Sequence, residues 1–315
     1  MPKKITMTML GPEAVGKTTL LATMYSQFRT INETYEHGFD FAPAGNTGKD
    51  LREALDKLRE VIEKPAFTRL PPLLAGTAGI IERQFEASFQ GKKELELSFY
   101  DLAGGLLVAT DDENQDVKEF KRILNQAAVI INIIDGAALV EGSKLLSDSI
   151  NQPVRTSELL QSALNNQQEH LILFVITKCE TWLKDEKGQK KLQRAFEYRH
   201  QAVIKLMRGQ QNVVGVLMPV KTLGCVEFSR IEGRGEDETI LFSRKPDLDF
   251  SPEKVDQPLR YALDFALSQH DQNRGGWSKF IRWLSNKDRA FQRALGKFDL
   301  GREKKFKIYG NRSLL

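Results

Sequence analysis

The sequence predicts a three-layer α/β fold in which a mainly parallel sheet is covered by helices on both faces. Apolar runs and helical stretches alternate along the first two thirds of the 315 residues, as in chains that build βαβ units. The apolar runs are continuous instead of alternating with polar residues, which is typical of strands buried on both faces. With 41% apolar and 28% charged residues, the composition is that of an ordinary globular protein.

The predicted elements follow one another in a regular order. The parallel strands are expected at residues 5–10, 95–101, 129–135, 171–177 and 213–218. The helices are expected at residues 17–29, 49–64, 117–126, 157–166 and 189–207. A further run at residues 80–89 precedes the strand 95–101, and the Gln-Gly-Lys-Lys sequence between them predicts a hairpin turn. The hairpin therefore adds one antiparallel edge strand.

The chain divides into three predicted parts. The alternating pattern fills residues 1–225 and contains an insertion at about 32–74. Residues 226–270 begin as a loop or small hairpin and continue as a helix at 258–268 that packs back on the sheet. Residues 271–315 hold 12 Lys and Arg against 4 Asp and Glu, a net charge of +8, whereas the first 270 residues carry −4. We interpret this last part as a basic helical tail whose partners differ from those of the body.

The apolar tracts and the cysteines bear on the cellular location of the protein. The longest tracts, at residues 127–134 and 171–176, are shorter than the about 18 residues that cross a bilayer. The N-terminal apolar stretch is too short for a secretory signal. Cys179 and Cys225 are far apart and have no CxxC partner, which argues against a disulfide framework and against a cysteine-based zinc site. We expect a cytoplasmic protein.

The first functional motif joins the first predicted strand to the first helix. It fits the pattern GxxxxGK[ST] and reads Gly11-Pro12-Glu13-Ala14-Val15-Gly16-Lys17-Thr18. In such a P-loop the backbone N–H groups and the helix N-terminus surround the phosphates of a nucleotide. We expect Lys17 to reach the β- and γ-phosphates as a catalytic group and the Thr18 hydroxyl to bind Mg²⁺. The residues expected to contact the nucleotide are Gly11, Glu13, Ala14, Val15, Gly16, Lys17, Thr18 and Thr19.

The second motif ends the strand at residues 95–101. Asp101 is followed by Leu-Ala and then Gly104, which makes the pattern DxxG. An acidic residue at the end of a strand beside a P-loop is suited to hold Mg²⁺, usually through water, and the N–H of Gly104 can approach the γ-phosphate. As an isolated tetrapeptide, DxxG is an ordinary turn. Its position after the P-loop favours the functional interpretation.

The third motif, Thr77-Ala-Gly-Ile, stands directly before the run at residues 80–89. Together with the DxxG strand, it resembles the passage from switch I to switch II in the Gα and Arf-like members of the TRAFAC class of GTPases. The resemblance covers residues 1–225 and implies a G-domain fold, a GTP/GDP switch, and a catalytic, Mg²⁺-binding role for Thr77. The alternative is a loop threonine that caps a strand. The insertion before Thr77 is similar to that of bacterial Ras-like proteins of the double-GTPase type.

The fourth motif follows the strand at residues 171–177 and reads Thr177-Lys178-Cys179-Glu180. It resembles the NKxD or TKxD motif, in which the lysine stem packs on guanine and a carboxylate accepts from the guanine N1–H and amino group. Adenine lacks that donor pair. Glu180 is one methylene longer than the usual aspartate, which leaves open an ATPase with a coincidental motif. Lys221 occupies the place of the loop that backs the base, or is a surface charge.

Two catalytic side chains of the resembled families are missing. Gly105 stands where Ras and Gα proteins place the glutamine that orients the attacking water, and Leu74 stands where Gα proteins have an arginine. Arg69 and Arg83 flank the segment, but the sequence aims neither at a phosphate. We expect slow Mg²⁺-dependent hydrolysis that a protein partner completes. The alternative is a nucleotide-bound assembly module that does not hydrolyse.

Two further segments offer surfaces for partners. The acidic residues between 110 and 116 form either a partner-binding loop or a solvated loop. In the tail, apolar and basic residues share a helical spacing, namely Trp277, Phe280, Ile281 and Leu284 with Lys279, Arg282 and Lys287. Such a helix can lie on an anionic membrane, dock in the groove of a partner, or pack on the core. No nucleic-acid motif accompanies the basic residues.

Overall fold

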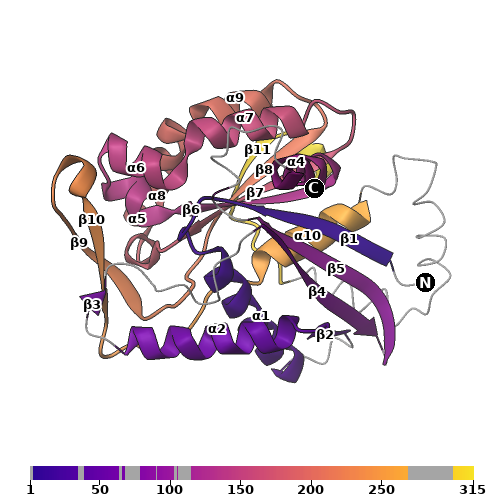
Figure 1. Cartoon of the computed structure of the whole chain (residues 1–315), viewed down its shortest axis with the longest axis horizontal. Coiled ribbons are helices and arrows are strands. Elements are labelled where there is room, and N and C mark those ends of the chain that lie inside the picture. Colours follow the sequence, from indigo (N-terminus) through magenta and orange to yellow (C-terminus); the bar gives the residue numbers. More distant parts are fainter. Residues whose placement is uncertain are drawn as a thin grey trace.

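The computed structural model describes residues 3–34, 39–63, 66–67, 79–89, 91–102, 105, 115–268 and 301–315. An eight-stranded sheet runs through the molecule in the order β11-β8-β7-β6-β1-β5-β4-β2 (Figure 1). Its central parallel strands are β8 (Val213–Pro219), β7 (His170–Thr177), β6 (Val129–Asp135), β1 (Lys3–Leu10) and β5 (Lys92–Leu102). Every residue of β6 and of β7 is buried. The predicted three-layer α/β fold is confirmed.

Antiparallel strands flank this parallel centre on both sides. The predicted hairpin strand is β4 (Ile80–Phe89), which pairs with β5. It is not the edge, because β2 (Phe39–Pro43) pairs with its other side. At the opposite edge, β11 (Lys307–Gly310) pairs with β8. The prediction of a helical tail over residues 271–315 is therefore wrong for its last part, because Lys307–Gly310 form a strand of the main sheet.

Helices cover both faces of the sheet (Figure 1). On one face lie α1 (Lys17–Thr34), α2 (Thr47–Ile62) and α10 (Gln257–Ser268). On the other lie α4 (Gln115–Gln126), α5 (Gly136–Glu141), α6 (Lys144–Asn151), α7 (Pro153–Ala163), α8 (Glu186–Arg199) and α9 (Gln201–Arg208). The single helix predicted at 189–207 is wrong, because the chain leaves the helical conformation at His200. Among the described residues, no helix is both long and apolar enough to cross a membrane.

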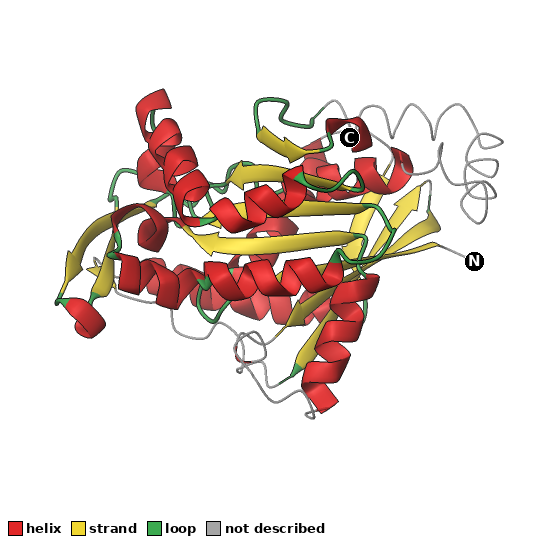
Figure 2. Ribbon diagram, turned by 90° about the horizontal axis from the view of Figure 1, so that it is seen from above, coloured by secondary structure: helices red, strands yellow, loops and turns green. Residues whose placement is uncertain are grey.

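A second sheet of three short strands stands beside the first. The hairpin predicted as an alternative for residues 226–270 is formed by β9 (Val226–Glu232) and β10 (Thr239–Arg244). On its other side β10 pairs with β3 (Ala66–Phe67), which comes from the insertion. Figures 1 and 2 show this three-stranded sheet at one end of the molecule, on the side to which β1 runs from the N-terminal end. The carboxyl ends of the parallel strands therefore face it.

Candidate functional site

The P-loop occupies the turn between β1 and α1. Ala14 and Gly16 adopt positive φ angles of 64° and 106°, so the loop curls before the helix begins at Lys17. A Cβ at Gly16 would lie 3.2 Å from Oγ1 of Thr177, and the backbone conformation there is one that side chains rarely adopt. This conformation aims the first amides of α1 at the carboxyl edge of the sheet, which is the arrangement that binds phosphate.

Lys17 lies folded back on this loop. Its Nζ donates to the carbonyl oxygen of Gly11 at 2.7 Å and to that of Pro12 at 3.0 Å. Burial lowers the pKa of Lys17, and the nearby charges of Asp101 and Glu13 oppose that shift. Neutral carbonyls are weaker partners for an ammonium than phosphate oxygens are, so the lysine can exchange one set for the other.

Asp101 stands next to the P-loop strand, with its Cα opposite Met9 of β1. The side chain is 1% exposed, and within the described part of the chain its Oδ1 has no hydrogen-bond partner. Burial raises the pKa of Asp101, while Lys17 and Arg83 pull it the other way. A bound ion or water is one explanation for a buried carboxylate oxygen without a partner. Together with the hydroxyl of the half-buried Thr18, this oxygen is of the kind that Mg²⁺ prefers.

The sequence predicted no role for Arg83, and in the structure its side chain is buried in β4. Its side chain is 2% exposed and donates through a guanidinium nitrogen to Oδ2 of Asp50 at 3.2 Å. Because residues alternate along a strand, Arg83 shares the α2 face of the sheet with Phe85, which is also buried. The arginine therefore ties the inserted helix α2 to the strand beside Asp101.

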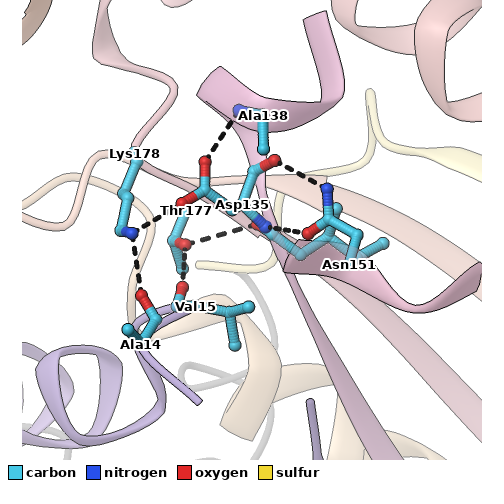
Figure 3. A network of polar contacts seen from close by, with 8 residues as sticks. Ala14, Val15, Asp135, Ala138, Asn151, Thr177 and Lys178 are labelled. Atoms are coloured by element: carbon cyan, nitrogen blue, oxygen red, sulfur yellow. Dashed lines mark hydrogen bonds and ion pairs between the residues drawn. The ribbon is translucent and has the colours of Figure 1, made fainter. Parts of the chain in front are cut away.

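The end of β7 and the loop after it form hydrogen bonds to the P-loop (Figure 3). Thr177 Oγ1 donates to the carbonyl oxygen of Val15 at 2.6 Å. Lys178, at a positive φ of 51°, donates through Nζ to the carbonyl oxygen of Ala14 at 2.8 Å and to Oδ2 of Asp135 at 2.5 Å. The two predicted motifs, far apart in sequence, are thus joined directly.

Asp135 is a member of this network that the motif analysis missed. It ends β6, is 2% exposed, and caps α5 by accepting from the N–H of Ala138 at 2.9 Å. Asn151 fixes its backbone, because the Asp135 N–H donates to Asn151 Oδ1 at 2.8 Å and Asn151 Nδ2 donates to the Asp135 carbonyl (Figure 3). The available signal was an acid at the end of a buried strand, the same signal that identified Asp101.

Glu180 begins the 3-10 helix η1 (Glu180–Leu183) and is buried. Its Oε1 accepts from the N–H of Leu223 at 3.1 Å and from Oγ1 of Thr222 at 3.4 Å. Burial raises the pKa of Glu180, and the backbone N–H groups that it meets limit the shift. The carboxylate therefore lies between the loop after β7 and the loop after β8.

These features together describe a nucleotide site of a known kind. A family model described as Double-GTPase 2 matches residues 5–213, which is more than half of the chain. The chain belongs to the Double-GTPase 2 family. It is a P-loop GTPase of the double-GTPase type, and the family implies guanine-nucleotide binding. No match is found among curated proteins.

The double-GTPase match ends at the first residue of β8, so the loop that contacts Glu180 lies beyond it. In that loop Lys221, the residue predicted to back the base, forms an ion pair. Lys221 Nζ pairs with Oε1 of Glu253 at 2.7 Å and faces a cavity of about 260 Å³ on the β11 side of the sheet. Thr222 and Leu223, which the sequence did not single out, make the contacts to the carboxylate instead.

Several predicted residues of this double-GTPase lie outside the described part of the chain. They are Thr77, Gly104, Leu74, Arg69, the acidic residues at 111–113 and the apolar and basic residues between 277 and 287. Their roles stay predictions. Gly105 is described: it is exposed, and a Cβ built there would meet no atom of the described residues within 4 Å.

Proposed function

We propose that this double-GTPase is a GTP/GDP switch with slow intrinsic Mg²⁺-dependent hydrolysis. The observation that carries the proposal is the phosphate end of the site, where Lys17 rests on carbonyl oxygens and a buried oxygen of Asp101 has no partner in the described structure. A γ-phosphate and a divalent cation would satisfy both groups. Thr18 and Asp101 would hold the cation, with Thr77 as the predicted further ligand.

The reaction needs little covalent chemistry from the protein. Water attacks the γ-phosphorus, the bond to the β–γ bridging oxygen breaks, and GDP and inorganic phosphate are released. The P-loop amides and Lys17 would stabilise charge on the transferred group. When bound, Mg²⁺ would neutralise charge on the β- and γ-phosphates.

Switching would come from segments that depend on the γ-phosphate. Thr77 and Gly104 are proposed to order their segments around it and to release them after hydrolysis. Hydrolysis should be slow without a protein partner, because Gly105 has no side chain with which to orient water. Isolated G domains without an arginine finger turn over at roughly 10⁻⁴ s⁻¹, and those with an arginine in cis at about 10⁻² s⁻¹.

Phosphate release by the purified chain tests the proposal. We expect slow, EDTA-sensitive turnover of GTP, and little turnover of GTP by Lys17→Ala. Titration with fluorescent GDP and ADP should show a clear preference for GDP. Complete absence of turnover, with and without candidate partners, would indicate a non-hydrolysing assembly module. Equal affinity for GDP and ADP would defeat the guanine assignment.

A further inference from the structure

Lys178 has a third neighbour that no motif contains. Besides the Ala14 carbonyl and the Asp135 carboxylate, its Nζ lies 5.7 Å from the centre of the Phe242 ring. Phe242 belongs to β10 and is 6% exposed. A cation at this distance over an aromatic face is attracted to it, and more strongly where water is excluded. The ring therefore adds an attraction to the ammonium beside those of the two oxygens.

The hairpin that carries Phe242 is also fixed to the chain just after Glu180. The N–H of Phe228 in β9 donates to Thr181 Oγ1 at 2.9 Å, and the Phe228 ring packs on Trp182 with centroids 5.6 Å apart. Glu227 pairs with Lys184 at 2.7 Å. These contacts anchor β9 to η1, so they fix the hairpin relative to the loop of Lys178, Cys179 and Glu180, here called the reading loop.

On its far side the same hairpin meets the insertion. The Cα of Phe242 is the register partner of Phe67 in β3. Arg244, two residues further along β10, pairs with Glu63 at 3.1 Å. Nine residues lie between Phe67 and Thr77 in the sequence. Phe242 thus lies against the lysine of the predicted guanine motif through its ring, and pairs through its backbone with β3 of the insertion.

We propose that Phe242 is a positioning residue for guanine binding, and that β10 transmits the state of the reading loop to β3. Its ring keeps the Lys178 ammonium on the P-loop carbonyl and the Asp135 carboxylate, so that the lysine stem is extended for the base before nucleotide arrives. The inference rests on the proposed guanine role of Lys178. The three-stranded sheet, most of which follows the last GTPase motif in the sequence, would then contribute to nucleotide binding.

Variants at Phe242 distinguish the effect of its aromatic face from the effect of its apolar volume. Phe242→Leu keeps an apolar side chain but removes the π-face, whereas Phe242→Tyr keeps it. We expect the leucine variant to bind fluorescent GDP about tenfold more weakly, about 1.4 kcal/mol, and the tyrosine variant to bind like the wild type. Phe228→Leu is the comparison variant, because it removes a ring of the same hairpin that packs on Trp182 of η1; it should cost less GDP affinity than Phe242→Leu. Equal affinities for the leucine and tyrosine variants, with thermal melts showing both folded, would overturn the proposal.

A double-mutant cycle shows whether Phe242 acts through Lys178. Residues in contact give non-additive effects, so Phe242→Leu should cost no further affinity in a Lys178→Met background. If Lys178→Met weakens GDP binding and Phe242→Leu adds its full effect to it, the positioning role is wrong and the proposed function stands. If Lys178→Met leaves GDP binding and the preference over ADP unchanged, the guanine assignment fails together with this inference.

Hydrogen–deuterium exchange tests the transmission to β3. GDP should slow amide exchange in residues 63–67 of the wild type, and the slowing should be absent or much reduced in Phe242→Leu at saturating GDP. Unchanged exchange of this segment in the wild type would overturn the transmission.

Discussion

The two ends of the proposed nucleotide site, the phosphate end at Lys17 and Asp101 and the base end at Lys178 and Glu180, differ in how far the protein satisfies its own polar groups. At the phosphate end, the Lys17 ammonium donates to two neutral carbonyl oxygens, and nothing in the described chain pairs with Asp101 Oδ1. At the base end, Lys178 and Glu180 already have their partners, an aspartate for the lysine and a backbone N–H for the glutamate. The phosphate end is built to be completed by a ligand, whereas the base end is assembled beforehand.

Because of this difference, we expect the phosphate end to supply most of the affinity and the base end to supply the specificity. Charge-assisted contacts to phosphate are the strong ones, and the phosphate end can form them only when nucleotide is bound. A pre-assembled base end costs little ordering on binding, and its fixed carboxylate can reject a base that lacks the matching donors. Variants at the phosphate end should therefore change all nucleotides together, and variants at the base end should change the ratio between them.

The largest expected effect is at the phosphate end. Lys17→Ala should weaken GDP and ADP binding alike by about 2–5 kcal/mol, because it leaves phosphate charge without its buried partner. The empty protein should melt at the same temperature or higher, since burial of the ammonium, which lowers the pKa of Lys17, is itself unfavourable.

Lys221→Ala is the matched control, because that lysine is paired with Glu253 and lines a separate cavity with it. It should keep GDP affinity, measured by the same titration, close to that of the wild type. A loss as large as that of Lys17→Ala would mean that Lys221 turns to the base when nucleotide binds.

Glu180 gives the next effect, and it depends on pH. Because burial raises the pKa of Glu180, it becomes protonated at a higher pH than an ordinary glutamate as the solution is acidified. The protonated acid loses an acceptor for guanine, so GDP affinity should fall with pH by up to about tenfold per unit below that pKa. ADP affinity should fall less.

The measurement is the ratio of GDP to ADP affinity between pH 5 and pH 8. Glu180→Gln should give a low ratio that no longer changes across this range. A wild-type ratio that stays constant down to the lowest pH at which the protein remains folded would show that the carboxylate does not read the base.

A smaller effect is expected at Asp135. Asparagine caps helices about as well as aspartate, so Asp135→Asn keeps the cap of α5 but removes the charge that holds Lys178. GDP affinity should fall about tenfold, as expected for about 1.4 kcal/mol, with a change in melting temperature of only a few degrees. Isothermal titration and a thermal melt measure both. A large loss of stability with intact affinity would make Asp135 a purely structural residue.

What the sequence predicted well is local in the chain. A P-loop binds phosphate through consecutive backbone amides, so one short motif predicts it, and these residues form a curled turn before α1. The roles of Lys17 and Thr18 stay predictions. The continuous apolar strands likewise predicted the parallel centre of the sheet. The TKCE motif located Lys178, whose contacts to Ala14 and Asp135 then followed from the fold.

What the sequence missed depends on contacts between distant segments. Arg83 and Phe242 gain their places only when α2 and β3 fold against them. Strands of two and four residues, β3 and β11, are too short to show a periodicity. The break at His200 interrupts an otherwise helical pattern without a proline or a glycine, so no local signal marked it.

The smallest effect expected from this comparison is a gain at Gly105, where the phosphate end lacks a catalytic side chain. A Cβ there meets no described atom within 4 Å, so the described residues leave room for a side chain. Gly105→Gln should raise single-turnover GTP hydrolysis by up to about tenfold, because a carboxamide can orient water. Gly105→Leu, of similar size, should leave the rate unchanged, and GDP affinity should be the same in both variants. Equal rates in the two variants would mean that position 105 does not face the γ-phosphate, and that the missing group must come from a partner.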